Sequence, residues 1–232
     1  MLPPETPQQI SLDLAAGPRM TRDDFIAGQS NRAALEIIER WPAWGSTVTI
    51  LSGPAGSGKS HLAAIWQERA KAIRIAPAGL GGIVQSAPPQ QALIEDLDGS
   101  AFDEPTLFHL INALQQSGGL LLITSRLRPR DWRISLADLR SRLTSAMSVA
   151  IDEPNDTLLA AVIAKLFADR QVDVDASVIS FLVNRMERSL AAAVDIVDRL
   201  DRLALERQVR ISRSLAASLV PGVDPGQAEL DL

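Results

Sequence analysis

The sequence predicts a doubly wound α/β domain on a parallel sheet, followed by a small domain made only of helices. Three observations lead to this prediction. Short apolar runs alternate with amphipathic helical segments before residue 152, a glycine loop joins one run to a helix, and only helical patterns follow Pro154. Strands that alternate with helices favour a parallel sheet covered on both faces. We place the α/β domain at residues 21–153 and the helical domain at 154–220, and we expect a flexible arm at 1–20 and a flexible tail at 221–232.

Five short apolar runs are the candidate strands of the sheet. They lie at residues 47–51, 73–75, 92–94, 120–124 and 147–151. Runs of this length without polar alternation are typical of parallel strands whose two faces are both covered. We therefore expect all five strands to be buried.

Apolar residues at helical spacing predict helices between these runs and after them. In the α/β domain the segments are 31–41, 60–73 and 104–116, and Gly118 ends the last of them. In the second domain, Leu158, Val162 and Leu166 repeat every four residues and form one apolar stripe. The residues predicted to cap helix N-termini there are Asp156, Asp175, Ser189 and Ser212.

Composition and charge exclude several classes of protein. The chain has 232 residues, 46% of them hydrophobic, which is enough for a substantial core. The sequence contains no cysteine, so it has neither a disulfide framework nor a Cys-ligated metal. Its N-terminus lacks an export-signal pattern, and no apolar run approaches the roughly 20 residues that cross a bilayer. A net charge of −5 gives no overall attraction to nucleic acid. We therefore expect a cytoplasmic protein without a membrane span.

The residues from Gly53 to Ser60 match the P-loop pattern G-x-x-x-x-G-K-[ST] completely. A predicted strand precedes the loop and a predicted helix follows it, whereas a simple glycine turn needs neither. In such loops, backbone N–H groups and the helix N-terminus bind phosphate oxygens. We predict that Lys59 binds the β- and γ-phosphates of ADP or ATP and that Ser60 supplies a hydroxyl to Mg²⁺. The predicted nucleotide contacts here are Gly53, Pro54, Ala55, Gly56, Ser57, Gly58, Lys59, Ser60 and His61.

Polar residues end the two strands that follow the P-loop along the chain. Glu95 and Asp96 close the run at 92–94, and in P-loop enzymes such acids hold the metal and orient the attacking water. We predict catalytic roles for both and assign Glu95 to Mg²⁺. Thr124 closes the next run and is a candidate contact for the γ-phosphate or the water. Acids at a strand end also occur as helix caps or as solvated loop residues.

Six arginines crowd one segment of the chain, at positions 126, 128, 130, 133, 140 and 142. They could form a solvated face, a patch that contacts phosphates, or an arginine finger offered to the nucleotide of a neighbouring subunit. Composition alone does not choose among these interpretations.

Several motifs together resemble the DnaA-type replication initiators of the AAA+ class. The stretch from Asp24 to Arg32 looks like the family's motif beside the adenine pocket. The P-loop, the acid pair and the segments 123–125, 141–143 and 150–154 follow in the family's order, so the resemblance covers about residues 20–220. It implies strand order 5-1-4-3-2 with a helical lid, Phe25 and Ile26 near the base, and Arg142 as an arginine finger acting in trans.

We expect no C-terminal DNA-binding domain of the kind that full initiators carry, because the sequence ends soon after the predicted lid, and this short form resembles the Hda-type regulators of the family. The resemblance implies docking on the DNA sliding clamp and stimulation of ATP hydrolysis on the initiator DnaA, which prevents re-initiation. Gln9, Leu12 and Leu14 match the clamp-binding peptide of such regulators. Residues 227–232 repeat the pattern, and a solvated tail is the simpler interpretation there. DNA would be contacted only indirectly or weakly, and self-association stays open.

Three departures from the family pattern predict weak or no ATPase activity of the chain's own. The acid pair is Glu-Asp instead of Asp-Asp, and Arg126 stands where initiators have an acidic residue. Ala191 occupies the position of the lid arginine, and we expect Arg188, three residues earlier on the same helical face, to reach the phosphates instead. Two rival functions remain: an autonomous ATPase that loads or remodels DNA-bound replication proteins, and a DNA-binding module that uses the arginine cluster.

Overall fold

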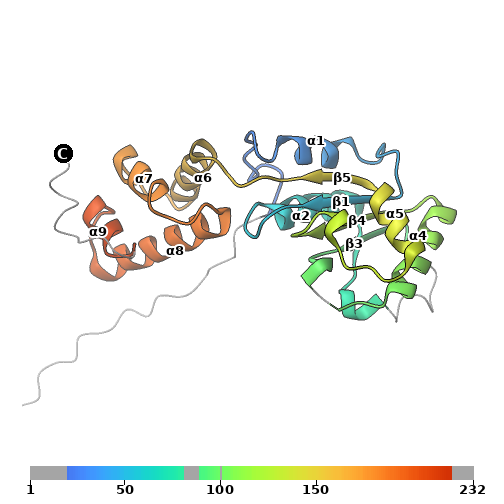
Figure 1. Cartoon of the computed structure of the whole chain (residues 1–232). Helices are drawn as coiled ribbons and strands as arrows, with labels where there is room; N and C mark the ends of the chain where they lie inside the picture. Colours follow the sequence, from blue (N-terminus) through green and yellow to red (C-terminus); the bar gives the residue numbers. More distant parts are fainter. Residues whose placement is uncertain (1–19, 81–88, 100, 221–232) are drawn as a thin grey trace, which may run out of the picture.

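A computed structural model of the chain describes residues 20–80, 89–99 and 101–220. These residues form an α/β part and a helical part, which follow one another along the chain and lie side by side (Figure 1). The predicted clamp-binding residues Gln9, Leu12 and Leu14 lie outside the described residues, as does the similar pattern at 227–232.

The sheet has the predicted parallel order. Its strands are β1 (Val48–Ser52), β2 (Ile73–Arg74), β3 (Gln91–Ile94), β4 (Leu120–Ser125) and β5 (Met147–Ala150). Within the described residues they form a five-stranded sheet in the order β2-β3-β4-β1-β5, and every neighbouring pair is parallel. This is the expected 5-1-4-3-2 arrangement read from the opposite edge.

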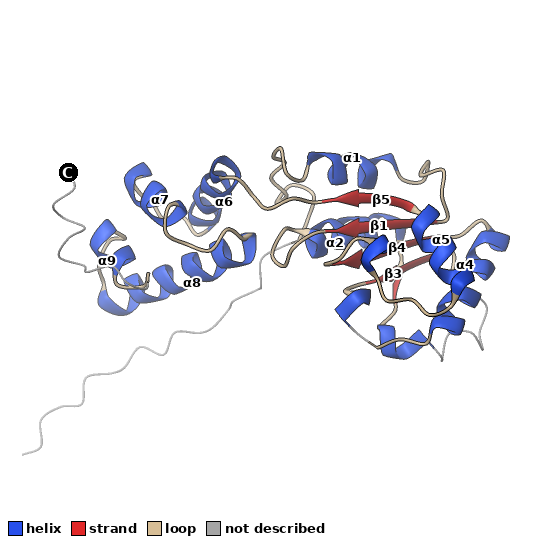
Figure 2. Ribbon diagram, viewed as in Figure 1, coloured by secondary structure: helices blue, strands red, loops and turns tan. Residues whose placement is uncertain are grey.

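Helices cover both faces of the sheet because successive strand residues point to opposite sides. On one face, Leu51, Leu93 and Leu122 pack with α1 (Arg32–Arg40) and α2 (Lys59–Ala70). On the other face, Ile50, Ile94 and Ile123 pack with α4 (Glu104–Ser117) and α5 (Ala137–Ser145). Short 3₁₀ turns complete this part at η1 (Pro77–Gly79), η2 (Leu97–Gly99) and η3 (Pro129–Asp131). Figure 2 shows the strands enclosed between these helices.

The prediction that all five strands are buried was wrong at the edges of the sheet. The residues of β1 are all buried, but both residues of β2 are exposed, and the Ile73 side chain is 54% exposed. The residues of β5 are exposed or only partly buried. An edge strand has a neighbour on one side only, so less of its surface is covered than that of a central strand.

The helical part, called the lid from here on, contains only helices among the described residues from 155 to 220. They are α6 (Asp156–Asp169), α7 (Ala176–Val183), α8 (Leu190–Arg207) and α9 (Arg213–Ala217), and they share one apolar core. Ser189 and Ser212 cap α8 and α9 as predicted, since each hydroxyl accepts a backbone N–H. Asp175 stands at the cap position of α7 without a side-chain hydrogen bond. Asn155, not Asp156, caps α6, because its Oδ1 accepts the Leu158 N–H at 2.9 Å.

Two glycines of the α/β part lie in contact with the lid. The Leu190 N–H at the start of α8 donates to the Gly56 carbonyl at 2.8 Å. A Cβ added at Gly28 would lie 3.1 Å from Cδ2 of Leu158 in α6. Both contacts place the lid against the loops that surround the P-loop. Within the described ranges, no helix has the length and apolarity needed to cross a membrane.

Candidate functional site

The P-loop lies at the carboxyl edge of the sheet, where β1 ends between β4 and β5. The Gly53 N–H donates to the Ser125 carbonyl at 3.2 Å, and the Ile151 N–H donates to the Ser52 carbonyl at 2.7 Å. A Cβ added at Gly53 would lie 2.4 Å from the Ile151 carbonyl oxygen. Only glycine therefore fits where β1 passes into the loop beside the end of β5.

The loop has the backbone shape of a phosphate cradle. Gly56 and Gly58 have φ angles of +69° and +98°, in the left-handed region that glycine adopts without strain. Gly58 lies immediately before α2, so the loop ends at a helix N-terminus. The Ser57 hydroxyl is buried and has no hydrogen-bond partner among the described residues. A buried polar atom without a partner costs stability unless a ligand satisfies it, so its place in the loop fits a phosphate.

Lys59 folds back over the loop. Its Nζ donates to the carbonyl oxygens of Gly53 at 2.8 Å and Pro54 at 2.7 Å, and the side chain is almost completely buried. Burial lowers the pKa of the Lys59 ammonium, the charge of Asp96 opposes this shift, and that of Arg126 adds to it. An ammonium held by neutral carbonyls keeps its charge available for a phosphate.

The two predicted acids differ in their interactions. The Glu95 carboxylate pairs with Arg74 of β2 at 2.6 Å, whereas the charge of Asp96 acts on Lys59. The Asp96 N–H donates to Oγ1 of Thr124 at 3.0 Å, and this bond links the ends of β3 and β4. Asp96 has a left-handed φ of 49°. The structure therefore brings Asp96 and Thr124 to the P-loop and engages Glu95 elsewhere.

A cavity of about 370 Å³ lies beside the first P-loop residues. It is lined by Ser52, Gly53, Pro54, Arg126, Arg128, Ala150, Ile151, Asp152 and Glu153. The sequence analysis singled out Arg126 as a departure from the family pattern but treated Arg128 only as a member of the cluster, with no place at the P-loop. The signal that could have found them is their position just after β4, whose carboxyl end borders the P-loop.

The loop from Asp24 to Asn31 forms the wall nearest the start of α2. Oδ1 of Asn31 accepts the Gly28 N–H at 2.7 Å, and its Nδ2 donates to the Ile26 carbonyl at 3.0 Å. The buried Phe25 ring meets the His61 ring edge to face, with centroids 5.2 Å apart. His61 Nε2 lies 2.8 Å from the Thr21 carbonyl, which fixes the proton on that nitrogen. Of the two predicted base-side residues, Phe25 therefore lies beside Gly58 and against His61 of α2, and Ile26 is held by Asn31 in the same loop.

Among the described residues, those of the lid that contact Gly56 carry no charge. The prediction that Arg188 shares a helical face with Ala191 was wrong, because α8 begins only at Leu190, after the Ser189 cap. Its guanidinium instead pairs with Asp156 at the start of α6. Ser189 and Ala191 face Gly56, since a Cβ added at Gly56 would lie 2.8 Å and 3.2 Å from their Cβ atoms.

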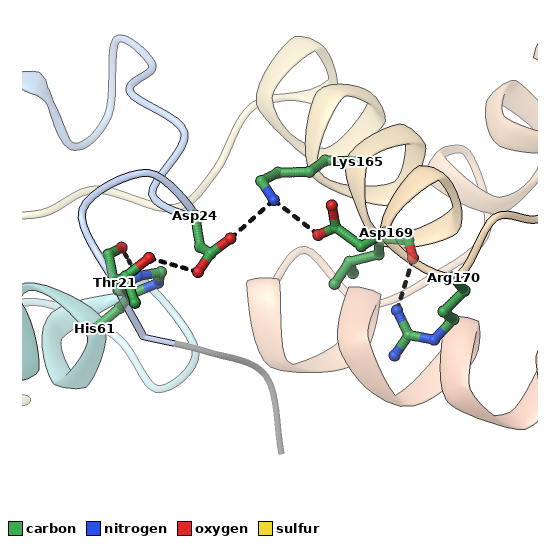
Figure 3. Close-up of polar contacts among 7 residues, drawn as sticks. Thr21, Asp24, His61, Lys165, Asp169 and Arg170 are labelled. Atoms are coloured by element: carbon green, nitrogen blue, oxygen red, sulfur yellow. Dashed lines mark hydrogen bonds and ion pairs between the residues drawn. The ribbon is translucent and has the colours of Figure 1, made fainter. Parts of the chain in front are cut away.

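A second polar contact joins the lid to the loop before α1. Lys165 of α6 pairs with Asp24 at 3.0 Å and with Asp169 at 2.7 Å, as Figure 3 shows. Thr21 donates its hydroxyl to the other oxygen of Asp24 at 2.6 Å.

Arg142 lies on α5 with its guanidinium held on two sides. One nitrogen donates to Oε1 of Gln115 at 2.7 Å, and the guanidinium carbon lies 5.2 Å from the centroid of the Phe108 ring. Both partners belong to α4, and no contact joins Arg142 to the P-loop among the described residues.

The donor set near the P-loop suits Mg²⁺ only together with phosphates. The described residues include no group of three or more His, Cys, Asp or Glu side chains placed to hold a metal. Ser60 is exposed and is the second residue of α2, and the charge of the Asp96 carboxylate acts on Lys59. One hydroxyl, one carboxylate, phosphate oxygens and waters form the kind of ligand set that Mg²⁺ uses.

Comparison with known proteins gives a consistent set of relatives. No family model matches the chain. It is 27% identical to the chromosomal replication initiator protein DnaA of Thermomicrobium roseum, over 86% of this chain and 49% of that protein. It is 25% identical to DnaA of Roseiflexus castenholzii, over 87% and 48%. The chain thus spans about half the length of these curated relatives.

Solved structures with the same fold include domain III of Thermotoga maritima DnaA, with a TM-score of 0.74, 18% identity and coverage of 88% of this chain and 96% of that one. A replication initiator DnaA bound to AMPPCP and single-stranded DNA gives a TM-score of 0.70 at 20% identity, over 83% and 68%. The Thermotoga maritima RuvB Holliday junction branch migration motor gives 0.70 at 17%, over 87% and 71%. The chain is therefore related to the initiator DnaA at modest sequence identity and has the AAA+ fold found in DnaA domain III and RuvB.

Proposed function

We propose that this chain is a nucleotide-bound regulator of chromosomal replication initiation, which stimulates hydrolysis of the ATP held by a DnaA initiator. In this proposal the P-loop binds ATP or ADP with Mg²⁺ and holds the α/β part and the lid in one arrangement. The left-handed glycines, the buried Lys59 and the unpartnered Ser57 hydroxyl support nucleotide binding. The relatedness to DnaA supports a role in replication initiation, and a structural neighbour binds AMPPCP.

The position of Arg142 is the observation that carries the proposal. Helix α5 ends at Ser145, and β5 then begins at Met147 and runs parallel to β1 toward the P-loop edge. Arg142, in the last turn of α5, therefore lies near the amino end of β5, whereas the chain's own P-loop follows the carboxyl end of β1. Met147 and Ile151 alone are separated by about 13 Å of extended strand. This separation from the chain's own P-loop supports a role for the guanidinium at the nucleotide of a second molecule.

An arginine supplied in trans places positive charge where the transition state of phosphoryl transfer gains negative charge. Such a group raises the rate by about 10³ to 10⁵ in the GTPases that use one. A head-to-tail contact supplies the geometry, since a heterologous interface sets one subunit's arginine at the next subunit's nucleotide. Gln115 and Phe108 support this role because they hold the guanidinium in one direction before a partner binds.

Docking on the sliding clamp is proposed from the sequence of the N-terminal arm. An extended peptide would place Leu12 and Leu14 in an apolar groove while Gln9 hydrogen-bonds at the rim. Docking would raise the local concentration of the chain near initiators at the clamp. The test is clamp-dependent hydrolysis of initiator-bound ATP, with wild type compared with a variant in which Gln9, Leu12 and Leu14 are all alanine. Equal stimulation by both proteins would remove the clamp from the proposal.

An autonomous ATPase is the second candidate, and the charge of Asp96 beside Lys59 favours it. The engagement of Glu95 by Arg74 argues against it, because one of the two acids then has another partner. Turnover of ATP by the isolated chain, measured for wild type and Asp96→Asn, separates the two. Fast turnover that Asp96→Asn abolishes would favour the autonomous enzyme over the regulator.

A further inference from the structure

We infer that Asn31 is a positioning residue for the nucleoside half of the nucleotide. Its buried side-chain amide shapes the loop of residues 24–30 and connects this loop to the lid, whereas the phosphate half is left to the P-loop. The inference rests on the proposed nucleotide binding and deepens it, because it assigns part of the affinity for the nucleotide to a residue outside the P-loop motif.

The Asn31 side chain is bonded to the loop that precedes it. Asparagine is among the residues preferred at a helix N-cap, where its oxygen accepts an N–H of the first turn. Asn31 occupies this position before α1, yet its side chain makes no such bond. Its Oδ1 instead accepts the Gly28 N–H at 2.7 Å, and its Nδ2 donates to the Ile26 carbonyl at 3.0 Å. The amide therefore stabilises the loop rather than the helix.

Burial makes these two bonds important for the shape of the loop. Asn31 is only 1% exposed, so water does not reach its side chain to replace a lost partner. A buried polar group that loses its partner costs more stability than the bond itself contributed. The Gly28 carbonyl is also held, since it accepts the N–H groups of Asn31 at 3.3 Å and Arg32 at 3.0 Å. Both backbone groups of Gly28 are therefore fixed from the start of α1.

The loop that Asn31 holds lies beside the P-loop and has backbone donors to offer. Cε2 of Phe25 would lie 3.7 Å from a Cβ added at Gly58, which immediately precedes α2. In the described part of the chain, the N–H groups of Ile26 and Ala27 have no hydrogen-bond acceptor. Phosphates bound at the N-terminus of α2 would place the attached nucleoside near this ring and these donors. An aromatic surface with a few polar backbone groups suits a heterocyclic base.

The same loop is in contact with the lid. A Cβ added at Gly28 would lie 3.1 Å from Cδ2 of Leu158, and the Ser30 carbonyl accepts the Asp152 N–H at 3.1 Å. Asp152 lies between β5 and α6, in the segment through which the chain enters the lid. The glycine that packs against the lid is also the glycine that Asn31 holds. A ligand that orders the loop should therefore also order the start of α6.

The test compares ligands with and without the nucleoside. The full-length chain, purified free of nucleotide, is titrated by calorimetry with Mg-ADP and with Mg-pyrophosphate, the latter directly and by its displacement of ADP. We expect Asn31→Ala to weaken ADP binding about tenfold and pyrophosphate binding less than about twofold, because the lost bonds hold the loop and not the P-loop. A residue that only stabilised the fold would affect both ligands equally.

Two further variants support this comparison. Asn31→Asp keeps an acceptor for the Gly28 N–H and loses the donor to the Ile26 carbonyl, so it should also weaken ADP binding more than pyrophosphate binding. The matched control is Ser212→Ala, which removes the side-chain hydrogen bond that caps α9 in the lid. It should leave both affinities unchanged.

A measurement on wild type needs no variant. Hydrogen exchange of residues 24–30 and of the first turn of α6 should slow several-fold with saturating Mg-ADP and should not slow with saturating Mg-pyrophosphate.

Three results would overturn the inference and leave nucleotide binding intact. They are equal weakening of both ligands or unchanged ADP affinity in a folded Asn31 variant, equal slowing of exchange by both ligands, and binding of ADP by wild type without measurable binding of pyrophosphate. The last result would mean that the phosphate half does not bind independently of the loop. Failure of folded wild type to bind either ligand would overturn the proposed nucleotide binding together with the inference.

Discussion

Nζ of Lys165 in the lid lies 3.0 Å from Oδ1 of Asp24, which belongs to the loop before α1 and is 141 residues earlier in the chain. Each side chain is little more than a quarter exposed. The bond joins the lid to the loop that also carries Phe25 and Ile26 (Figure 3). Movement of the lid would therefore be transmitted to the loop on the predicted base side of the nucleotide site.

Loss of this ion pair should loosen the lid. We expect Lys165→Met, which keeps the apolar stem, to lower the free energy of unfolding by about 0.5 to 1 kcal/mol, the upper range for partly exposed pairs. Asp169→Ala is the control, because it removes the neighbouring partner of Lys165 and leaves the bond to Asp24. Urea denaturation of wild type, Lys165→Met, Asp24→Asn and the double variant Lys165→Met/Asp24→Asn gives the coupling energy of the pair. Strict additivity of the Lys165 and Asp24 changes would show that the pair does not couple the two parts.

The same pair predicts a dependence of stability on pH. Hydrogen bonding from Thr21, followed by that from Lys165, holds the pKa of Asp24 below 3.8, so its contribution is present above that value and is lost as the pH falls through the folded pKa. Bonds to Asp169, then to Asp24, raise the pKa of Lys165 above 10.5, so its contribution is lost as the pH rises through the folded pKa. The stability difference between wild type and Lys165→Met should be constant over roughly pH 5 to 9 and should shrink on both sides. A difference that changes sign near neutrality would contradict this assignment.

Substitution of Gly56 should destabilise the protein by more than the backbone strain at its φ angle, because Gly56 is also in contact with the lid. Gly56 and Gly118 have nearly equal φ angles of +69° and +72°, but a Cβ at Gly56 would meet Ser189 at 2.8 Å and one at Gly118 would meet nothing within 4 Å. Gly118→Ala should cost about 1 kcal/mol from backbone strain, and Gly56→Ala should cost more and also weaken nucleotide binding. Thermal denaturation and nucleotide titration measure both effects. Equal losses of stability in the two variants would show that the lid moves away from residue 56 without a measurable loss of stability.

The two acids after β3 should contribute unequally to binding of the Mg-nucleotide. Asp96 acts on Lys59, whereas Glu95 pairs with Arg74. We expect Asp96→Asn to raise the Mg²⁺ concentration needed for tight ATP binding by at least about tenfold, a change of about 1.4 kcal/mol. Glu95→Gln should change it by less than about twofold, about 0.4 kcal/mol. The reverse order would return the metal to Glu95, where the sequence placed it.

The sequence predicted the features that depend on local pattern. The parallel sheet follows from apolar runs such as 120–124, and the P-loop follows from a complete motif between a strand and a helix. It could not predict which strands lie at the edges, because exposure of Ile73 depends on how far neighbouring elements extend. Nor could it place Arg188. Residues three apart, such as Arg188 and Ala191, share a helical face only if both belong to the helix, and α8 begins after Arg188.

The contacts that the sequence missed join residues far apart in the chain. The pair of Arg74 with Glu95 and the pair of Asp24 with Lys165 depend on strand adjacency and on the angle of the lid, which no local pattern contains. The cavity that gathers Arg126 and Arg128 with Gly53 likewise exists only because β4 lies beside β1. Such contacts set the electrostatics of the site, so its chemistry was less predictable than its position.

The most direct test of the proposed regulator measures a single turnover of labelled ATP preloaded on the cognate DnaA initiator, with clamp loaded on DNA. The added proteins are wild type, Arg142→Ala, Arg142→Lys, and Arg140→Ala as an arginine control on the same helix. We predict that wild type and Arg140→Ala stimulate hydrolysis. Arg142→Ala should lower the stimulated rate by about 10³-fold or more, the size of the effect of arginine fingers in GTPases. Arg142→Lys should restore the rate only in part. Equal stimulation by Arg142→Ala and wild type, or no stimulation by folded, nucleotide-loaded wild type, would contradict the account.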